Sequence, residues 1–437
     1  MNLLTRNLLV LFVGLLLGLS LALTHGVLAE RPAHSQAAGL PLNMVRTLSE
    51  VFGKIKADYV DEVDDKTLLE NAIRGMVNGL DPHSAYLDRK DFEELRVGTT
   101  GEFGGLGIVV GMEDGFVKVI SPIDDTPAQR AGVKAGDLII RLNDTPVKGL
   151  TLDQAVNIMR GKPGTRITLT IVREGEEKPL KITLTRAKIK VKSVRFKVLE
   201  DGYDYVRISQ FQEHTAADLR KAIRKLRKKN GGKFKGLVLD LRNNPGGLLD
   251  SAVAVSDVFL DKGVIVSVKG RTEKDKLVRS ARAGDLTDGA PIVVLVNEGT
   301  ASASEIVSGA LQDHRRAIIM GQRTFGKGSV QTVIPLGNDT ALKLTTARYY
   351  TPSGRSIQAE GIEPDIVLDN LQIKEQEERF KPVTEADLTG HLANPNGKGK
   401  KEKSESKGNS KELVTKDYPV YEALIVLKGL NLLKAGK

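Results

Sequence analysis

The segment "PIVVLVNEGTASASEIVSGALQDHRRAIIMGQRTFGKGSVQTV", residues 291–333, carries the strongest indication of the fold. Its first six residues are apolar throughout, which is typical of a strand that is buried on both faces. After the turn "NEGTA", the stretch "SASEIVSGALQD" places Ile306, Val307 and Ala310 on one face of a helix. A second apolar strand, "RAIIM", comes next. This order predicts an α/β domain, and the strands "GLVLDL" and "VIVSV" extend the pattern over the chain after residue 188.

Ser302 lies where the turn meets the start of the expected helix. The first amide groups of a helix have no acceptor within the helix, and together with the helix dipole they favour negative charge. A serine at this position suits a nucleophile whose neighbouring amides stabilise an oxyanion. A serine that only caps the helix is the alternative and, for an isolated serine at a helix start, the commoner role, so the catalytic interpretation depends on finding a base for Ser302.

The histidines provide no convincing base for this serine. The chain has six of them: His25, His34, His83, His214, His314 and His391. His314 follows Ser302 by twelve residues on the same helix. At the usual rise per residue it lies about 18 Å along the axis, beyond hydrogen-bond reach. His214 precedes a different helix, where a capping role is expected.

Lys327 is the better candidate for the base. It follows "RAIIM" and lies between Gly326 and Gly328, which let the backbone bring it close to another element. Burial lowers the pKa of a lysine toward neutrality, so its amine can accept the serine proton. If "KGSVQTV" is extended, Gln331 points to the same side as Lys327 and can hold the amine in place. A lysine exposed on a surface loop is the alternative.

The glycine pair in "DLRNNPGG" completes the expected site. Gly246 and Gly247 follow a buried strand and precede a helix. A backbone amide from this pair can form half of an oxyanion hole, and the amide of Ala303 can form the other half. An ordinary turn between a strand and a helix explains the two glycines as well.

A β-rich stretch precedes the α/β domain. From "GEFGGLGIVV" onward the glycine density rises, and the short alternating strands "FVKVI", "LIIRLN", "ITLTIV" and "LKITLT" follow. One helix interrupts them, which Thr151 caps and which carries an apolar stripe. About ninety residues of this kind predict a small, partly open β-barrel domain with one or two helices.

The loop "GGLGI", residues 104–108, can bind a peptide end. Successive amides around Leu106 and Gly107 suit the capture of a terminal carboxylate, and an extended peptide can pair with the strand that Ile108 begins. Arg160 ends the helix at 152–160, where a cation suits the helix dipole. Contact with a substrate or with the α/β domain is the alternative role for Arg160.

The two ends of the chain differ from the middle. Residues 1–29 combine Arg6, an apolar run and the small-residue ending Val27–Ala29, which predicts an export signal; an uncleaved membrane anchor is the alternative. Either places the remainder outside the cytoplasm. Residues 30–96 predict helices, two of them capped by Asp65 and Asp88. Residues 393–412 are polar and of low complexity, typical of disorder, and a last amphipathic helix is expected over 418–434.

Composition excludes several classes of protein. Of 437 residues, 40% are hydrophobic and 27% are charged, as in ordinary globular proteins. Aromatics reach only 4% and tryptophan is absent, which argues against a nucleic-acid stacking surface. The net charge of +10 comes largely from dispersed basic residues, so we expect a solvated surface, with attraction to anionic lipid as the alternative. The absence of cysteine excludes disulfides, thiolate metal sites and a cysteine nucleophile.

Several motifs together resemble the C-terminal processing peptidases, also called tail-specific proteases, which are PDZ-containing serine endopeptidases. They span about residues 43–368 and are "YVDEVD", "LDPHSAYL", "GEFGGLGI", "SPIDDTPAQRAGVKAGDLI", "DLRNNPGGLL", "TASASEIVSGALQD", "GQRTFGKGSVQ" and "TPSGRSIQAEGIEPD". The resemblance implies Ser302 as nucleophile, Lys327 as general base and Gln331 as the residue that orients it. It also implies a homodimer formed through terminal helical regions. The turn departs from the usual serine-rich form at Thr300, while Ser302 keeps its spacing from Lys327.

The resemblance implies an α+β multidomain fold, in which a PDZ domain is inserted before an α/β protease core of the crotonase or Clp-protease type. The expected divisions are 1–29 signal or anchor, 30–96 helical region, 97–187 PDZ domain, 188–368 protease core and 369–437 C-terminal region.

The interpretation that unites these features is an exported serine endopeptidase that needs no metal or cofactor. It binds the C-termini of protein or peptide substrates through the PDZ domain and cleaves near them through an acyl-enzyme on Ser302. A non-catalytic PDZ scaffold is the rival from another class, and an intact Ser302, Lys327 and Gln331 argue against it. A crotonase-type acyl-CoA enzyme would leave the PDZ domain unexplained.

Overall fold

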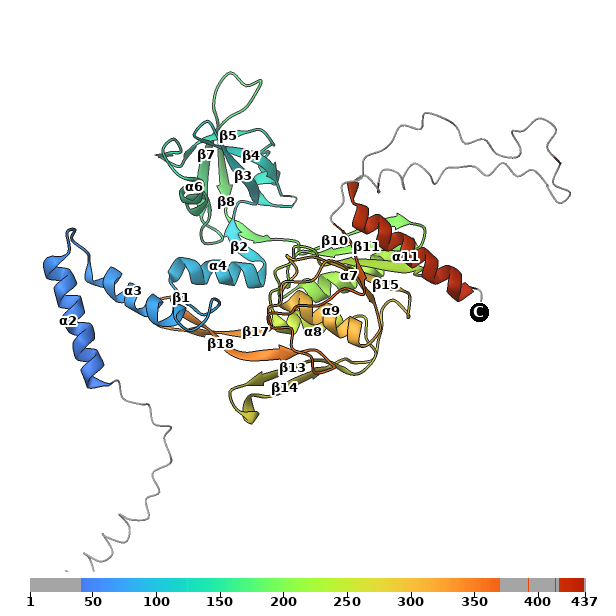
Figure 1. Ribbon diagram of the computed structural model, residues 1–437. Helices are drawn as coiled ribbons and strands as arrows, with labels where there is room; N and C mark the ends of the chain where they lie inside the picture. Colours follow the sequence, from blue (N-terminus) through green and yellow to red (C-terminus); the bar gives the residue numbers. More distant parts are fainter. Residues whose placement is uncertain (1–40, 124, 370–391, 393–412, 414–415, 436–437) are drawn as a thin grey trace, which may run out of the picture. The chain divides into compact units, whose positions relative to one another are not determined.

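The computed structural model describes residues 41–123, 125–369, 392, 413 and 416–435 (Figure 1). The chain divides into two compact units, residues 1–76 and 77–437. The expected signal or anchor at 1–29 and the expected disordered stretch at 393–412 lie outside the described residues. Among the described residues, no helix combines the length and the apolar character that crossing a bilayer requires.

The first unit contributes two helices, α2 (Leu42–Asp58) and α3 (Asp65–Asn78). None of the residues of α2 is buried, and leucines and valines on it stand exposed. The cap of α3 differs from the expectation of Asp65: the carboxylate of Asp64 accepts the Thr67 amide at 3.0 Å, and Asp65 is already helical. The sequence prediction was wrong by one residue because either aspartate fits the pattern.

The β-rich domain is built around a six-stranded sheet with the order β3-β4-β5-β7-β8, and β6 pairs with β5. Its core is apolar and fully formed, with Val117, Val119 and Ile139 completely buried. Two helices belong to it, α5 (Pro127–Arg130) and α6 (Leu152–Met159). The strands are β2 (Glu102–Gly105), β3 (Ile108–Glu113), β4 (Phe116–Pro122), β5 (Leu138–Leu142), β6 (Thr145–Pro146), β7 (Arg166–Val172), β8 (Leu180–Thr185) and β9 (Ala187–Lys190). Because β2 and β9 pair antiparallel, the chain enters and leaves this domain side by side.

The ends of α6 follow the expected chemistry. The Thr151 side chain accepts the Gln154 amide, and the Gln154 side chain accepts the Thr151 amide, so the two residues form a reciprocal capping box. The helix ends at Met159, with Arg160 as its C-cap. The predicted cap at Thr151 is confirmed, whereas the predicted end at Arg160 is one residue too far, because the backbone of Arg160 is already extended.

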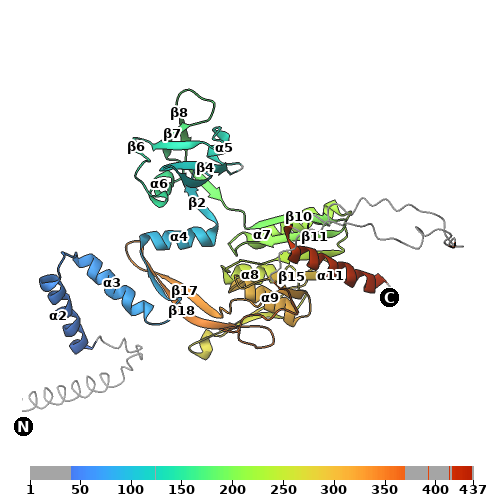
Figure 2. The ribbon, with the colours of Figure 1, turned by 45° about the horizontal axis from the view of Figure 1, so that its top comes forward.

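The α/β domain is a three-layer structure around a six-stranded sheet of order β10-β11-β12-β15-β16-β19 (Figure 2). β10 runs antiparallel to β11, and the other neighbours are parallel. The strands are β10 (Val194–Glu200), β11 (Tyr203–Ile208), β12 (Gly236–Asp240), β15 (Ile292–Val296), β16 (Ile318–Gly321) and β19 (Ile366–Val367). β12 and β15 are buried at every residue, as their apolar runs predict.

Helices cover both faces of this sheet. One face packs against α7 (Thr215–Lys229), α8 (Leu249–Ser256) and α9 (Ala303–Asp313). The other face packs against the C-terminal helix α11 (Tyr418–Ala435), through Val420, Ala423 and Leu427. Arg242 holds the start of α11, because its guanidinium donates to both Asp417 oxygens at 2.9 Å and also to the buried carboxylate of Asp240.

A second, five-stranded sheet lies beside the first in the α/β domain, with the order β1-β18-β13-β14 and β17 paired to β18. Its strands are β1 (Ala85–Leu87), β13 (Val264–Gly270), β14 (Leu277–Ser280), β17 (Ser329–Pro335) and β18 (Ala341–Tyr350). The short strand β1, which precedes α4 (Arg89–Thr100), pairs with residues 341–343 of β18. Segments far apart in sequence are therefore joined at the β17–β18 hairpin. The Asp88 side chain caps α4 by accepting the Asp91 amide at 2.9 Å, as predicted.

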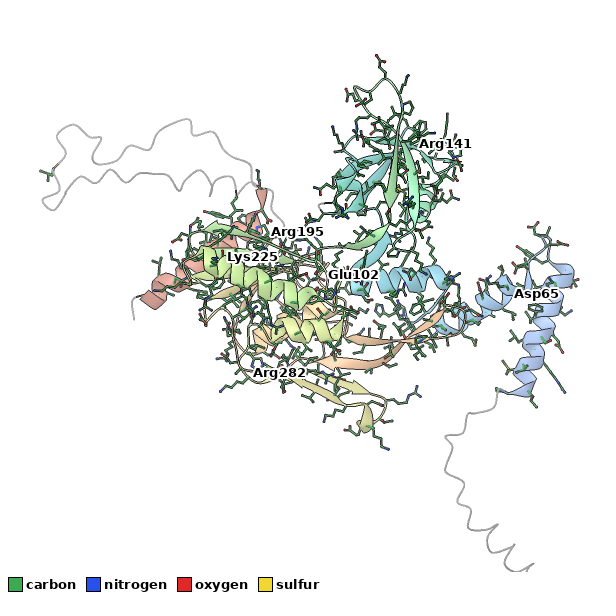
Figure 3. The ribbon with its side chains drawn as sticks, turned by 180° about the vertical axis from the view of Figure 1, so that it is seen from behind. Asp65, Glu102, Arg141, Arg195, Lys225 and Arg282 are labelled. Atoms are coloured by element: carbon green, nitrogen blue, oxygen red, sulfur yellow. The ribbon has the colours of Figure 1, made fainter. Side chains whose placement is uncertain are left out.

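The basic side chains are spread over many elements. Arg141, Arg195, Lys225 and Arg282 are all exposed and stand on different parts of the surface (Figure 3). This arrangement fits a solvated surface better than a single concentrated basic patch.

Candidate active site

Ser302 is the residue between the turn after β15 and the first turn of α9. Its backbone has φ 57° and ψ −114°, outside the regions that most residues with a side chain adopt. Such strain persists only when surrounding contacts hold the backbone in place, and it is frequent at active sites. The helix behind it is buried from Ala303 through Leu311, so Ser302 projects from a rigid support.

Glu305 supplies those surrounding contacts. Its carboxylate is fully buried and accepts four hydrogen bonds, two on each oxygen. The donors are the amides of Ser302 at 2.7 Å, Gly326 at 2.7 Å and Lys327 at 2.9 Å, and the hydroxyl of Thr324 at 2.5 Å. The position at the first turn of α9 also favours the negative charge. One carboxylate therefore fixes the backbone of Ser302 and the backbone of Lys327 together.

Lys327 lies in a half-buried environment that favours its neutral form. Its pKa is lowered from the ordinary value, first by burial and then by the nearby positive charge of Lys343. The carboxylates of Asp81 and Glu305 act in the opposite direction without reversing the shift. A lysine of this kind holds more neutral amine near pH 7 than an exposed lysine.

Ser302, Lys327 and Gln331 line one pocket of about 470 Å³, together with Lys343 and Tyr349. The structure thus brings the three predicted residues together from α9, the loop before β17, and β17 itself. Lys327 precedes the strand, and the register shifts between Val330 and Gln331, so simple alternation along an extended segment does not account for their common orientation.

The side chains of these residues have other partners in this structure. The Ser302 hydroxyl is hydrogen-bonded to the Tyr349 hydroxyl, which in turn donates to the Lys327 carbonyl. The Gln331 amide nitrogen donates to Ser329 at 2.9 Å and to Thr345 at 3.2 Å. Within the described chain, no hydrogen bond joins the Lys327 amine to either Ser302 or Gln331.

Tyr349 is buried beside Ser302. Burial raises its pKa well above the usual value, the charge of Glu305 raises it further, and the hydrogen bond from Ser302 acts the other way. The Tyr349 hydroxyl donates its one proton to the Lys327 carbonyl, so its oxygen accepts the hydrogen bond from the Ser302 hydroxyl. The serine proton therefore points at Tyr349 here, and a rotation of the hydroxyl is needed to present it to Lys327.

The expected oxyanion hole is only partly available. The Gly246 amide donates to the Asn244 side chain at 3.0 Å and cannot also serve an oxyanion without losing that bond. The Gly247 and Ala303 amides have no acceptor among the described residues. A Cβ atom at Gly246 would lie 2.8 Å from the Ser302 Cβ and 3.0 Å from the Ala303 nitrogen, so glycine allows the two loops to touch. The geometry favours Gly247 and Ala303 as the donors.

Sequence reasoning missed Glu305 and Tyr349. The spacing of Ser302 and Glu305 matches the capping-box pattern, which could have identified Glu305 as a partner of the serine backbone. No local pattern indicates Tyr349, because it comes from a strand 47 positions after Ser302.

Of the histidines that the structure describes, His83, His214 and His314, none lines this pocket. His314 contacts the Val264 carbonyl at 2.7 Å. His214 occupies the N-cap position of α7, as expected, but its side chain makes no capping hydrogen bond; its ring lies 3.6 Å from Glu102. Burial and the charge of Lys327 lower the pKa of His83, which favours its neutral form.

The β-rich domain has its own small pocket of about 100 Å³, lined by Leu106, Gly107, Ile108, Val156 and Arg160 among others. β3 is the end strand of its sheet, which leaves an edge for an added peptide strand. Gly107 has φ 78°, and a Cβ there would meet Thr126 at 2.3 Å, so the loop needs glycine. The Arg160 guanidinium stacks over the Phe103 ring at 5.4 Å, within the range of a cation–π contact.

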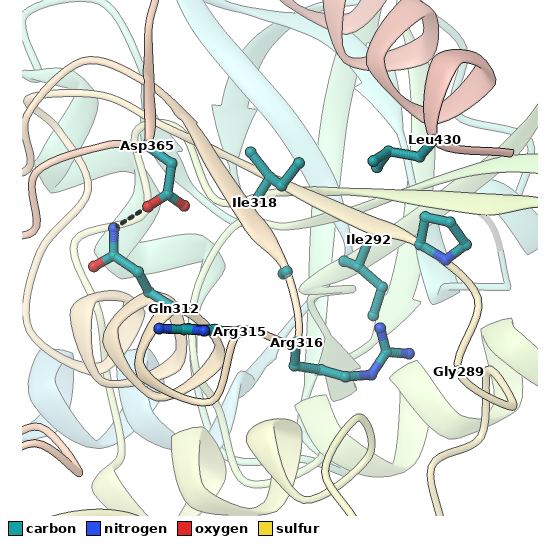
Figure 4. Close-up of a pocket in the computed structure, with 10 residues that line it drawn as sticks. Gly289, Ile292, Gln312, Arg315, Arg316, Ile318, Asp365 and Leu430 are labelled. Atoms are coloured by element: carbon teal, nitrogen blue, oxygen red, sulfur yellow. Dashed lines mark hydrogen bonds between the residues drawn. The ribbon is translucent and has the colours of Figure 1, made fainter. Parts of the chain in front are cut away.

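Another pocket of about 470 Å³ lies between the end of α9, the start of β16 and α11 (Figure 4). Arg316 in it is fully engaged, donating to Asp285, Thr287 and backbone carbonyls, and Gln312 donates to Asp365 at 2.9 Å. None of the predicted catalytic residues lines it. No cluster of His, Asp or Glu suited to a metal ion occurs in the described part of the chain.

Three family models match successive parts of the chain. Residues 202–368 match the model of peptidase family S41, residues 104–184 match that of the PDZ domain, and residues 23–91 match that of the activating protease CtpB N-terminal domain. The chain is 52% identical over 362 residues to a carboxy-terminal-processing protease of Bartonella bacilliformis, covering 83% of this chain and 82% of that one.

The chain is also similar to two other C-terminal processing proteases. The chain is 37% identical over 321 residues to the carboxy-terminal processing protease CtpA of Bacillus subtilis, covering 73% of this chain and 68% of the relative. A solved photosystem II D1 C-terminal processing protease is 32% identical, with a TM-score of 0.43 and coverage of 74% and 92%. The expected α+β multidomain fold with an inserted PDZ domain is confirmed.

Proposed function

The chain belongs to the C-terminal processing serine peptidases of family S41, and we propose that Ser302 and Lys327 form its catalytic dyad. The observation that carries this proposal is one pocket that contains a strained serine at a helix start and a half-buried lysine of lowered pKa. A buried neutral amine is a suitable base for a serine hydroxyl. The protein acts on peptide or protein substrates, and it needs no histidine for this chemistry.

The proposed reaction begins when the Ser302 hydroxyl turns from Tyr349 to the neutral Lys327 amine. The amine takes the serine proton as the serine oxygen attacks the peptide carbonyl carbon. The Gly247 and Ala303 amides stabilise the oxyanion. The protonated lysine then gives its proton to the leaving amine, which releases the C-terminal fragment. A water molecule, deprotonated by Lys327, hydrolyses the acyl-enzyme.

Gln331 is proposed as a positioning residue. In this structure its amide group is held by Ser329 and Thr345, close to the pocket that contains the lysine. A shift of its side-chain oxygen toward the Lys327 amine would fix the rotamer of the lysine. This role predicts a loss of kcat with little change in KM for Gln331→Ala.

The dyad is tested by digesting an unstructured protein with the wild type, Ser302→Ala, Lys327→Ala and the double variant. Each single variant should lose cleavage while its circular dichroism and melting temperature are retained. The double variant should be no worse than either single variant, because the two residues act as one unit. Full activity in Lys327→Ala would overturn the assignment. Cleavage that survives in Ser302→Ala would point to a different nucleophile.

We also propose that the PDZ domain binds the substrate C-terminus through the loop at Leu106, Gly107 and Ile108. The edge of β3 pairs with the tail, and the loop amides bind the carboxylate. Arg160 lies at the rim of the same pocket, where Phe103 holds its guanidinium. Amidating the substrate C-terminus should therefore slow cleavage. Equal rates for amidated and free-acid substrates would contradict the role of the loop.

The remaining proposals concern organisation. The apolar run at 1–29 favours export to an extracytoplasmic compartment, with cleavage or membrane anchoring as the two outcomes of a fractionation experiment. The exposed apolar residues of α2 favour a homodimer through the terminal helices, which light scattering tests. We retain 97–187 as the PDZ domain and 188–368 as the protease core.

A further inference from the structure

Lys343 is a second lysine in the pocket of Ser302 and Lys327. It belongs to β18, where it pairs with Val333 of β17, and Thr345 pairs with Gln331. Residues 343 and 345 are two apart on one strand, so their side chains lie on the same face of the hairpin. That face is the one from which Gln331 enters the catalytic pocket. The position of Lys343 in the pocket is therefore fixed by the pairing of β17 with β18 and does not depend on a flexible loop.

The Lys343 side chain is partly buried and lines the pocket, and it forms no ion pair with any carboxylate in the described part of the chain. A half-buried cation without a partner is uncommon, because desolvation is costly unless an anion offsets it. The carboxylate of Asp81 is close to Lys327 but is already bound by the Ser84 hydroxyl at 2.6 Å and by the His83 and Ser84 amides. Glu94 lines the same pocket and lies 3.9 Å from Lys90 instead.

The pocket thus has an unpaired positive charge where a substrate chain must pass. We propose that Lys343 is a specificity-determining residue that binds a carboxylate group of the substrate near the scissile bond. This inference rests on the proposed dyad, because it places the scissile bond at Ser302. The carboxylate comes either from an acidic side chain or from the main-chain terminus of a short tail, and both present the same charge to the ammonium.

The distance along the hairpin limits where that group lies. Two residues of a strand span roughly 7 Å, and an extended substrate rises by the same amount. A carboxylate that reaches Lys343 therefore belongs to a residue within a few positions of the scissile bond. An acidic residue much farther along the substrate would pass beyond the ammonium.

Lys343 also acts on the dyad. Its charge lowers the pKa of Lys327, while Asp81 and Glu305 raise it; Lys343 and Lys327 both lower the pKa of His83. Removing the Lys343 charge should raise the pKa of Lys327. Because the neutral amine is the base, the rising limb of kcat/KM should then move to higher pH. A purely structural role for Lys343 would not move this limb.

The experiment uses fluorogenic peptides of one sequence in which a single Glu, or a matched Gln, occupies each of the three positions on either side of the scissile bond. A second set carries a free or amidated C-terminus at the same distances. The enzymes are the full chain with the wild-type sequence, Lys343→Met, Lys343→Arg and the control Lys262→Met, which removes an exposed lysine outside the pocket. Ser302→Ala and Lys327→Ala are included as inactive references.

The wild type should prefer Glu to Gln at one position by about 5- to 20-fold at low salt, and less at high salt. Lys343→Met should reduce this ratio to about one, whereas Lys343→Arg and Lys262→Met should keep it. A preference confined to the free terminus identifies the main-chain carboxylate as the group. No preference at any position, or a preference that Lys343→Met retains, overturns the proposal. Activity in Lys327→Ala would instead show that the dyad itself is wrong.

Discussion

Replacing Glu305 by Gln tests whether one buried carboxylate holds Ser302 and Lys327, the two residues of the proposed dyad, in position. Gln has the same shape but only one acceptor oxygen, and its amide nitrogen would face donors. If the amide oxygen stays on Ser302 and Lys327, the Thr324 hydroxyl can turn to accept, but the Gly326 amide at 2.7 Å meets a donor. The hydrogen bond from the Gly326 amide to a charged carboxylate is therefore lost, and this buried amide is left without an acceptor.

The size of the effect follows from these losses. A hydrogen bond to a charged group contributes roughly 1.5–3 kcal/mol, and an unpaired buried amide costs roughly 1–3 kcal/mol. The sum is about 2.5–6 kcal/mol, which should lower the melting temperature by on the order of 10 °C. Displacement of the Gly326–Lys327 backbone by a fraction of an ångström should reduce kcat/KM by roughly 100-fold.

The assay combines thermal unfolding with peptide cleavage for wild type, Glu305→Gln and the control Glu298→Gln, which changes an exposed glutamate in the preceding turn. The control should match the wild type in both measurements. Glu305→Gln with wild-type kcat/KM and an unchanged melting temperature would refute the reasoning. A loss of stability without a loss of kcat/KM at a temperature where both proteins are folded would show that the carboxylate has no role in positioning the catalytic residues.

Three further predictions concern other parts of the α/β domain. Asp204 is fully buried, and one of its carboxylate oxygens has no partner in the described chain. Burial raises the pKa of Asp204 to about 6, so its ionised form destabilises the folded state at pH 7. Asp204→Asn should therefore stabilise the protein at pH 7 by about 2–3 kcal/mol. In denaturant titrations this gain should disappear as pH falls from about 6 to 4, because in that range the Asp204 carboxyl is protonated in the folded state while it is still ionised in the unfolded state. A gain that does not change with pH would contradict this prediction. Gly246→Ala should lower kcat/KM by at least about 10-fold, since its Cβ would lie 2.8 Å from that of Ser302, and an unaffected rate would show that the loops can separate. Asp417→Asn should speed amide hydrogen exchange in α11 by roughly 5- to 20-fold, because it removes the bidentate ion pair with Arg242. Unchanged exchange would mean that apolar packing alone holds the helix.

Local patterns predicted most of the fold. The strands "GLVLDL" and "PIVVLV" are buried as expected, and the helix caps at Asp88 and Thr151 form the predicted bonds. These features depend on short-range periodicity and on side chains that bond the backbone within one turn. The cap of α3 was misplaced by one residue because adjacent aspartates give the same signal.

The candidate site was predictable where its chemistry is local. Ser302 and Lys327 were found because a helix start and a glycine-flanked lysine are visible in short segments. The roles of Tyr349 and Lys343 could not be found, because only the pairing of β17 with β18 brings them beside the serine. The availability of the Gly247 amide rather than the Gly246 amide depends on a hydrogen bond to Asn244, which no pattern specifies.

The central claim is that a neutral Lys327 deprotonates Ser302. The most direct measurement is the rate constant for acylation of Ser302 by a peptide p-nitrophenyl ester, followed as the burst of nitrophenol between pH 6 and 10 in wild type and Lys327→Ala. The account predicts a wild-type rate that rises with pH, with an apparent pKa below the roughly 10.4 of an exposed lysine. Lys327→Ala should lack this limb and acylate at least about 100-fold more slowly. An unchanged burst rate and pH profile in Lys327→Ala would contradict the account.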